Sequence, residues 1–371
     1  MSLADATPRY GHRDYSMLGE EARDAERRGL KSAEWYHTEI SRKEMKELMK
    51  RSNGPAIRDT IIWLGLMIVF AGLAIWLWPS WWAALPLAAY GVLYGSATDS
   101  RWHECSHGTA FKTPWMNDVV YQIACFMIMR NPTRWRWSHT RHHTDTLIVG
   151  LDPEIAVMRP PVLLKVILAF VGVLDVWYAM KTMVMNTFGL ISADEKSFIP
   201  EMEWPKVILA ARIWFLIYAA TIALALYLNS WLPVVLVGLP RIYGAWHHVL
   251  TGLMQHGGLA DNVLDHRMNS RTVYINPISR FIYWNMNYHV EHHMFPMVPY
   301  HALPKLHAMI KHDLPAPTPS MWACYREMIP AWARQFRGED YFLVRDLPAT
   351  AKPYRPELHG QAPDLAPAAA D

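Results

Sequence analysis

The chain has 371 residues, of which 52% are hydrophobic types and only 19% are charged. Because an ordinary soluble domain has about 25% charged residues, this composition excludes a disordered or fibrous chain and argues against a simple soluble enzyme. A net charge of +3 is too small to indicate a nucleic-acid binder, and three widely spaced cysteines exclude a disulfide framework. The 18 histidines and 18 tryptophans instead indicate metal binding and a membrane interface.

Four apolar segments predict an all-α integral membrane protein with four transmembrane helices in two hairpins. Ile61–Trp78 and Trp81–Thr98 are each 18 residues long without a charge, and Pro79-Ser80 is the turn between them. Val207–Leu228 and Trp231–Leu250 form a second, less purely apolar hairpin. Each segment approaches the ~20 residues that cross a hydrocarbon core. The alternative is a set of core helices in a soluble all-α protein.

The positions of lysine and arginine orient the two hairpins. Both tight turns lack these residues, whereas the segment Arg101–Lys206 between the hairpins is rich in them. By the positive-inside rule, both termini and this middle segment are expected in the cytoplasm, where a helical cap would hold the site. We therefore expect a cytoplasmic tail with an interfacial helix over 1–58, a membrane catalytic domain over 59–315 and a cytoplasmic tail over 316–371. The lack of a fused electron-donor domain favours a bacterial inner membrane.

Shorter helices are expected outside the four spans. Ser41 with Glu44 forms a capping-box pattern, and Leu48 follows on the apolar face of that helix. This helix could pack on the protein or lie on the membrane surface. The interrupted apolar stretches 119–129 and 162–185 are expected to lie along the membrane or under the cap.

Three histidine clusters dominate the chemistry of the sequence. Each places two or three histidines three or four residues apart, which puts them on one face of a helix. All three clusters fall on the predicted cytoplasmic side. Their histidines are His103 and His107; His139, His142 and His143; and His289, His292 and His293.

Eight imidazoles are too many for one metal ion and suit two. Imidazole binds several transition metals, so the spacing alone does not choose among them. With few thiolates and no haem motif, a pair of iron ions that activates O₂ is the best chemical interpretation. Two alternatives remain: His103, Glu104 and His107 also spell the HExxH motif of a zinc peptidase, and clustered histidines could serve a metal carrier.

The last cluster carries a resemblance to a known family. The segment Asn287–Pro296 reads NYHVEHHMFP, which is similar to the last histidine box of acyl-lipid and sphingolipid desaturases. With the three boxes and two hairpins in this order, the chain resembles the membrane fatty acid desaturase and hydroxylase superfamily. The first box has three residues between its histidines, whereas stearoyl-type acyl-CoA enzymes have four, which points away from that subgroup.

The resemblance implies a di-iron centre whose ligands are the eight box histidines and one more. Leu253–His256 resembles the family segment that supplies the ninth ligand, so His256 is expected in that role, with His247 and His248 as rivals. The other histidines considered, His266, His301, His307 and His312, are expected to be ordinary structural or surface residues.

Carboxylates and amides near the boxes are expected to orient the ligands, because a metal-bound histidine usually donates its other N–H to an acceptor. The main candidates are Glu104, Asp145, Asp152, Glu291 and Asn287, with Asp99, Glu154 and Asn285 in addition.

The predicted function is O₂-dependent desaturation of a lipid acyl chain, with two iron ions as cofactors. The alternative on the same scaffold is a hydroxylase of an alkyl, sphingoid or terpenoid substrate. Electrons would come from a separate ferredoxin, rubredoxin or cytochrome-type donor. A strip of arginines and tryptophans could dock this donor or lipid phosphates, or simply anchor the protein at the interface: Arg130, Arg134, Trp135, Arg136, Trp137 and Arg141.

Overall fold

The computed structural model describes residues 13–355, and the regular secondary structure of this part of the chain is helical. The β contacts within it are two isolated bridges, Thr272 with Tyr288 and Val273 with Thr318. The all-α prediction is therefore confirmed. In chain order, the α-helices are α1 (Glu20–Arg27), α2 (Arg42–Leu48), α3 (Asn53–Leu77), α4 (Ala84–Gly95), α5 (Ala97–Ser106), α6 (Pro114–Ile128), α7 (Pro132–Thr144), α8 (Leu163–Phe170), α9 (Val173–Thr187), α10 (Ala193–Phe198), α11 (Trp204–Tyr227), α12 (Leu232–Leu236), α13 (Pro240–Tyr243), α14 (Trp246–His256), α15 (His266–Asn269), α16 (Pro277–Tyr283), α17 (His289–Met294), α18 (Leu303–Ile310) and α19 (Met321–Gln335).

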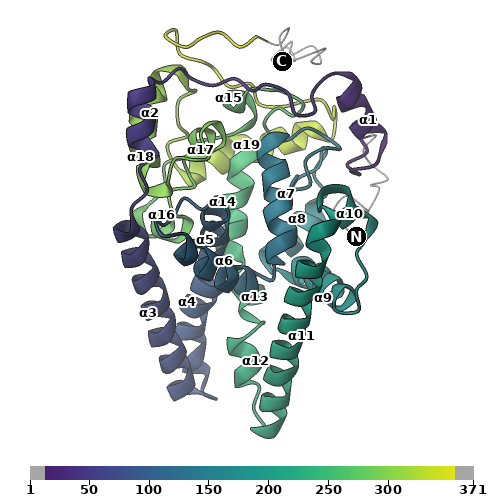
Figure 1. Cartoon of the computed structure of the whole chain (residues 1–371). Coiled ribbons are helices and arrows are strands. Elements are labelled where there is room, and N and C mark those ends of the chain that lie inside the picture. The colour runs from purple at the N-terminus through teal and green to yellow at the C-terminus, as the bar shows by residue number, and fades with distance from the viewer. Residues whose placement is uncertain (1–12, 356–371) are drawn as a thin grey trace.

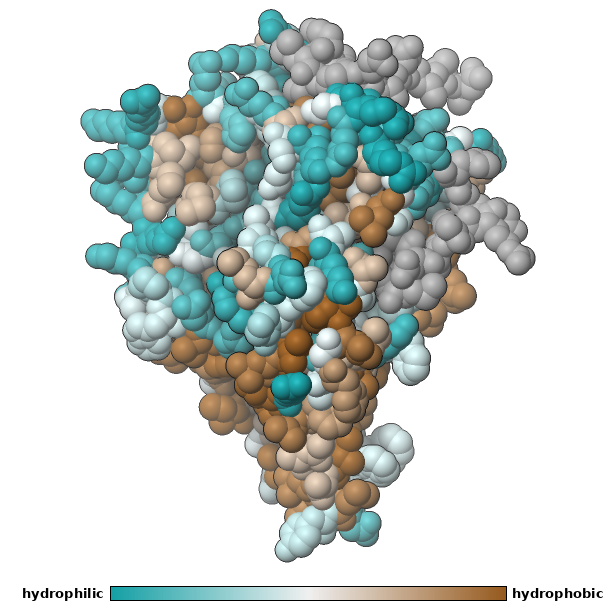
Figure 2. Space-filling model, turned by 45° about the vertical axis from the view of Figure 1, so that its right-hand side comes forward, coloured by the Kyte–Doolittle hydropathy of each residue, from teal (hydrophilic) through white to brown (hydrophobic). Residues whose placement is uncertain are grey.

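The helices form a narrow stem and a broad head (Figure 1). The stem contains α3, α4, α11 and α12, and the head contains most of the shorter helices. Figure 2 shows an apolar surface over the stem and a hydrophilic surface over most of the head. On the stem, Ile68 is 73% exposed and Leu226 is 74% exposed. Such a large exposed apolar surface fits lipid rather than water.

Two helices in the described part of the chain are long and apolar enough to cross a membrane, and they contain the first and third predicted spans. They are α3 and α11. A third crossing is possible only if α8 and α9, which bend by 83° at their junction, count as one broken span. The protein is thus a membrane-associated all-α protein with two or three candidate spans.

The second and fourth predicted spans are interrupted helices. α4 ends at Gly95, so the predicted span to Thr98 extends into α5, and the fourth segment is divided among α12, α13 and α14. The break before α14 lies where two backbones touch: a side-chain carbon added at Gly244 would lie 1.8 Å from the carbonyl oxygen of Gly91. Only glycine permits this approach, which joins the two halves of the stem.

The helix predicted after Ser41 packs on the protein. Ser41 and Glu44 form the expected capping box at the start of α2. Leu48 is buried in the main hydrophobic core, and a short break at residues 49–52 separates α2 from α3. In Figure 1, α2 lies above α3, at the edge of the head beside α18.

The C-terminal segment expected as a tail contributes to the head. α19 packs against α14 through Met328 and Trp332, which are buried with Leu253. This packing holds the end of α14, where His256 lies.

Candidate metal centre

Four helices of the head carry the nine histidines that the sequence singles out as ligands. α5 and its C-cap carry His103 and His107, and α14 ends at His256. α7 carries the second box and α17 the third. Helical spacing keeps the histidines of each set close together, because residues three and four apart lie on the same face.

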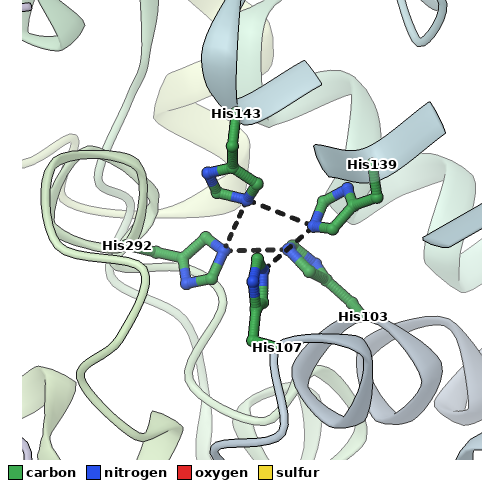
Figure 3. Close-up of side chains that lie close together, drawn as sticks. All are labelled: His103, His107, His139, His143 and His292. Carbon is green, nitrogen blue, oxygen red and sulfur yellow. Dashed lines mark hydrogen bonds between the residues drawn. The ribbon is translucent and has the colours of Figure 1, made fainter. Parts of the chain in front are cut away.

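Five of these histidines form one compact group (Figure 3). The Nε2 atoms of His103 and His292 are 2.9 Å apart, and that of His139 lies 3.1 Å from those of both His107 and His143. The potential ligand atoms of all five lie within 4.8 Å of one another. We call this the five-histidine group: His103, His107, His139, His143 and His292.

The other four histidines form a second group under the same 4.8 Å limit. The Nε2 atom of His289 lies 3.0 Å from that of His256 and 2.9 Å from that of His293. We call this the four-histidine group: His142, His256, His289 and His293.

The two groups are neighbours. The ring centroids of His143 and His293, one from each group, are 4.5 Å apart. α7 and α17 each supply ligands to both groups, which fixes the groups relative to each other. The geometry therefore offers two adjacent metal sites.

The charge state of the rings fits metal binding. Burial, reinforced by neighbouring imidazoles, lowers the pKa of His103 and His293 well below its ordinary value and lowers that of His256 to about 3. These rings are therefore neutral at pH 7, and neutral imidazole is the form that binds metal. Each neutral ring has one N–H, so several Nε2 lone pairs that face one another repel unless a cation lies between them. The donor set thus fits a metal ion in each group.

Two carboxylates, the buried Asp152 and the partly buried Glu154, each orient one histidine, and the two histidines belong to different groups. Asp152 lies 2.8 Å from Nδ1 of His142, and Glu154 lies 3.1 Å from Nδ1 of His139. Burial opposes ionisation of Glu154, but His139 and His142 outweigh it and lower the pKa of Glu154 to about 2. With Nδ1 protons directed at carboxylates, the Nε2 atoms are left for a metal.

The other predicted orienting residues contact the surrounding fold. Glu104 accepts hydrogen bonds from the Thr109 hydroxyl and the Tyr300 backbone, and burial raises its pKa to about 7. The Asn287 amide donates to the carbonyl of Val273.

Further predicted residues also act away from the ligand rings. Asp145 accepts from the backbone N–H of Ser32, and Glu291 bonds with Thr272 and His307. Asp99 pairs with Arg130, and Asn285 donates to the carbonyl of Tyr300.

Comparison with known proteins identifies the family of the chain. The family model for fatty acid desaturases matches residues 77–325, which is more than half of the chain. The chain belongs to the fatty acid desaturase family. Membership makes it an oxidoreductase of the lipid-desaturating class and implies the use of iron. The matched region contains all nine histidines of the two groups.

Three plant desaturases illustrate the similarity. The acyl-lipid omega-3 desaturase (cytochrome b5) of the Arabidopsis thaliana endoplasmic reticulum is 25% identical over 284 residues, which cover 71% of this chain and 72% of the relative. The chloroplastic omega-3 fatty acid desaturase of Sesamum indicum is 24% identical over 272 residues (68% and 59%). The chloroplastic sn-2 acyl-lipid omega-3 desaturase (ferredoxin) of Helianthus annuus is 25% identical over 274 residues (68% and 60%). The matches thus span about three fifths of the two chloroplastic relatives.

The rival histidines for the ninth position lie outside both groups of this desaturase. His247 contacts the Ser279 hydroxyl at 3.0 Å, and the backbone N–H of His248 donates to Ser96. The zinc-peptidase alternative loses its support as well, because His103 and His107 belong to a five-histidine group and Glu104 is bonded elsewhere.

The arginine strip is largely paired within the chain. Arg130 bonds Asp99 at 2.9 Å and lies over the Trp135 ring, and Arg141 pairs with Asp145. Arg134 and Arg136 also face carboxylates, those of Asp194 and Asp118. These contacts favour a role in holding α7 in place over a role as a donor-docking surface.

Two histidines expected to be ordinary lie directly behind the centre. His307 contacts Glu291, which stands between His289 and His292 in the third box. The His266 ring is 5.1 Å from that of His293. Neither has a motif spacing that links it to a box, so the sequence held no local signal for this placement.

Proposed function

We propose that this desaturase introduces a double bond into acyl chains carried by membrane lipids, using two iron ions and O₂. The observation that carries the proposal is the pair of adjacent histidine groups, five and four, at the top of an apolar stem. The names of the relatives, acyl-lipid omega-3 desaturases, support a lipid-borne substrate and suggest an omega-3 position.

The nine histidines of the two groups would hold the metals. When bound, two iron ions would supply the O₂ activation needed to remove hydrogen from an unactivated methylene, which no side chain can do. The chain's own residues then fix the geometry. Asp152 and Glu154 hold the rings of His142 and His139 in the tautomer that presents Nε2. Trp102, buried against His103 and His139, keeps water from one side of the five-histidine group.

The proposed topology has four crossings in two hairpins, with the head in the cytoplasm. The stem supports it, since α4 and the broken α12–α13 segment run beside α3 and α11 (Figure 1). The lysines and arginines between the hairpins favour a cytoplasmic head. A bacterial inner membrane stays a prediction, since the relatives are named for the endoplasmic reticulum and the chloroplast.

A separate electron donor completes the proposal. Desaturation consumes two electrons per double bond, and the relatives are named for cytochrome b5 and ferredoxin. A soluble one-electron carrier of the ferredoxin, rubredoxin or cytochrome type would fill this role.

The decisive experiment compares lipids from cells that express the wild-type chain and a ligand variant. We expect the wild-type extract to contain acyl chains lighter by two hydrogens and purified protein to contain about two iron ions per chain. His289→Ala should abolish the product. A gain of one oxygen in the lipid would instead identify a hydroxylase.

His312→Ala is the matched control, because His312 is exposed on the head, and its hydrogen bonds to the described residues join its ring to the carbonyl of Met309 and its own carbonyl to the Thr350 hydroxyl. It should retain iron and product. Wild-type protein that purifies without iron, or with a single zinc, would contradict the proposal.

A further inference from the structure

An N-terminal segment without helical structure crosses the top of the head between α1 and α2 (Figure 1). It lies outside the region that matches the family model. Despite lacking regular structure, it buries several of its side chains: Leu30 is fully buried and Trp35 is only 9% exposed, in a cluster with Ile148 and Leu264. We call residues 30–38 the strap. Since irregular segments ordinarily run over the surface, the burial of these side chains calls for a physical cause.

The strap is tied to the ends of the second and third boxes. The indole N–H of Trp35 donates to the carbonyl of Thr144, and the backbone N–H of Ser32 donates to Asp145, both at 2.9 Å. The backbone N–H of Thr38 lies 3.2 Å from the sulfur of Met294. Thr144 and Asp145 directly follow His143, and Met294 directly follows His293.

A stack of rings connects the strap to the four-histidine group. The Trp35 indole lies parallel to the His266 ring, with centroids 4.3 Å apart and planes 5° apart. The His266 ring in turn lies 5.1 Å from that of His293. The hydrogen bond at Nδ1 of His293 is a 3.2 Å contact with the Thr146 hydroxyl, so packing against His266 must help to set the angle of this ring.

A buried carboxylate fixes the far end of the strap. Asp313 accepts hydrogen bonds from the hydroxyls of Tyr36 and Thr38, and Arg267 bonds the same carboxylate while lying 3.7 Å over the Tyr36 ring. Burial alone would raise the pKa of Asp313, but these hydrogen bonds outweigh it and lower that pKa. The carboxylate is therefore charged, and loss of these hydrogen bonds would leave a buried charge without partners.

The five-histidine group has a different support. Its ring neighbour is Trp102 on α5, with centroids 5.7 Å from His103 and 5.2 Å from His139. Trp102 lies within the family match, whereas Trp35 does not. The two groups thus have different tryptophan neighbours, one inside the family match and one outside it.

We propose that the strap is a structural part of the metal centre, in which Trp35 and His266 act as positioning residues that hold His293 and retain the metal of the four-histidine group. The inference rests on the proposed function, because it takes two bound metals as given. It assigns a role to an N-terminal segment that contains no metal ligand.

The test measures iron loss from purified protein loaded with two iron ions, during exposure to an iron(II) chelator. Trp35→Ala should release one of the two ions about tenfold faster than wild type and the other at the wild-type rate. His266→Leu, which removes the middle ring, should do the same. Trp35→Phe keeps a ring on His266 and should release iron nearly as wild type does. Trp322→Ala, which removes an indole that is 73% exposed on α19, is the control and should leave both rates unchanged.

Thermal unfolding of each variant shows whether faster iron release accompanies a general loss of stability. Trp35→Leu keeps apolar volume in the cluster while breaking the ring stack, and it serves if Trp35→Ala does not fold. The inference would be overturned if a variant released both ions equally faster than wild type. It would also be overturned if Trp35→Leu and His266→Leu released both ions at the wild-type rate. Neither result would affect the proposed desaturase function. Wild-type protein that never holds two ions would instead overturn the proposed function.

Discussion

The two histidine groups are built from the same boxes, yet they depend on the fold to different degrees. The five-histidine group takes every ligand from the three boxes and rests on Trp102 beside the first of them. The four-histidine group needs His256 from α14 and is backed by His266 and the strap. All ligands of the five-histidine group therefore come from short sequence motifs, whereas the four-histidine group also depends on packing between distant parts of the chain. Four experiments sharpen or break this contrast.

The largest effect is expected from His256→Ala. This change leaves three histidines in the four-histidine group, so we expect iron content to fall from two ions to about one per chain and desaturation to drop by at least about a hundredfold. Iron analysis of purified protein together with lipid mass spectra measures both. Retention of two ions would place the ninth ligand elsewhere, with His248→Ala as the comparison because it lies outside both groups.

A smaller effect on metal content is expected from His107→Ala. The five-histidine group would still offer four imidazoles, so two ions should remain bound, with affinity for one reduced about 10- to 100-fold. Titration with iron(II) under anaerobic conditions measures this affinity. If His107→Ala lost one iron ion as completely as His256→Ala is expected to, the two groups would be equally sensitive to the loss of one ligand, and the contrast between them would be wrong.

Asp152→Asn and Glu154→Gln form a matched pair, one for each group. Each keeps the size of the side chain but removes the charge that faces Nδ1 of a ligand, His142 or His139. We expect each to weaken one site by about tenfold, Asp152→Asn in the four-histidine group and Glu154→Gln in the five-histidine group. Spectra of iron-57 protein that distinguish the two ions would assign the sites. A loss at the opposite group would refute the assignment.

The smallest effect is expected outside both groups, from Ser41→Ala. Ser41 caps α2 through Glu44, and removal of such a cap costs about 1 kcal/mol. Thermal unfolding should shift slightly, while iron content and product stay unchanged. A change in iron content would show that α2, too, supports the centre.

Much of the centre could be predicted because its signals are local. Histidines three and four residues apart share a helix face whatever surrounds the helix, so the membership of each box followed from spacing alone. The first and third spans followed from long apolar runs, the third broken only by Arg212, and α3 and α11 are long and apolar enough to be these spans. The capping box of α2 was equally readable from Ser41 and Glu44.

The remaining features could not be predicted, because they depend on contacts between distant residues. The fourth segment is apolar enough to suggest one helix, but it breaks where Gly244 meets the backbone of Gly91, some 150 residues earlier in the chain. His266 and His307 looked ordinary because their partners, Trp35 and Glu291, are separated from them in sequence. The sequence left the role of the arginine strip open between docking and anchoring, because it did not show that Asp99 pairs with Arg130 or that Asp145 pairs with Arg141.

The sequence by itself determined the helical class, the long apolar runs and the three sets of imidazoles, since each depends on residues within one or two helical turns. The family resemblance already favoured His256, but only the tertiary structure divided nine histidines into five and four and brought the strap onto the back of the site. Those outcomes depend on which distant surfaces bury each other, and short-range sequence periodicity does not predict which surfaces these are.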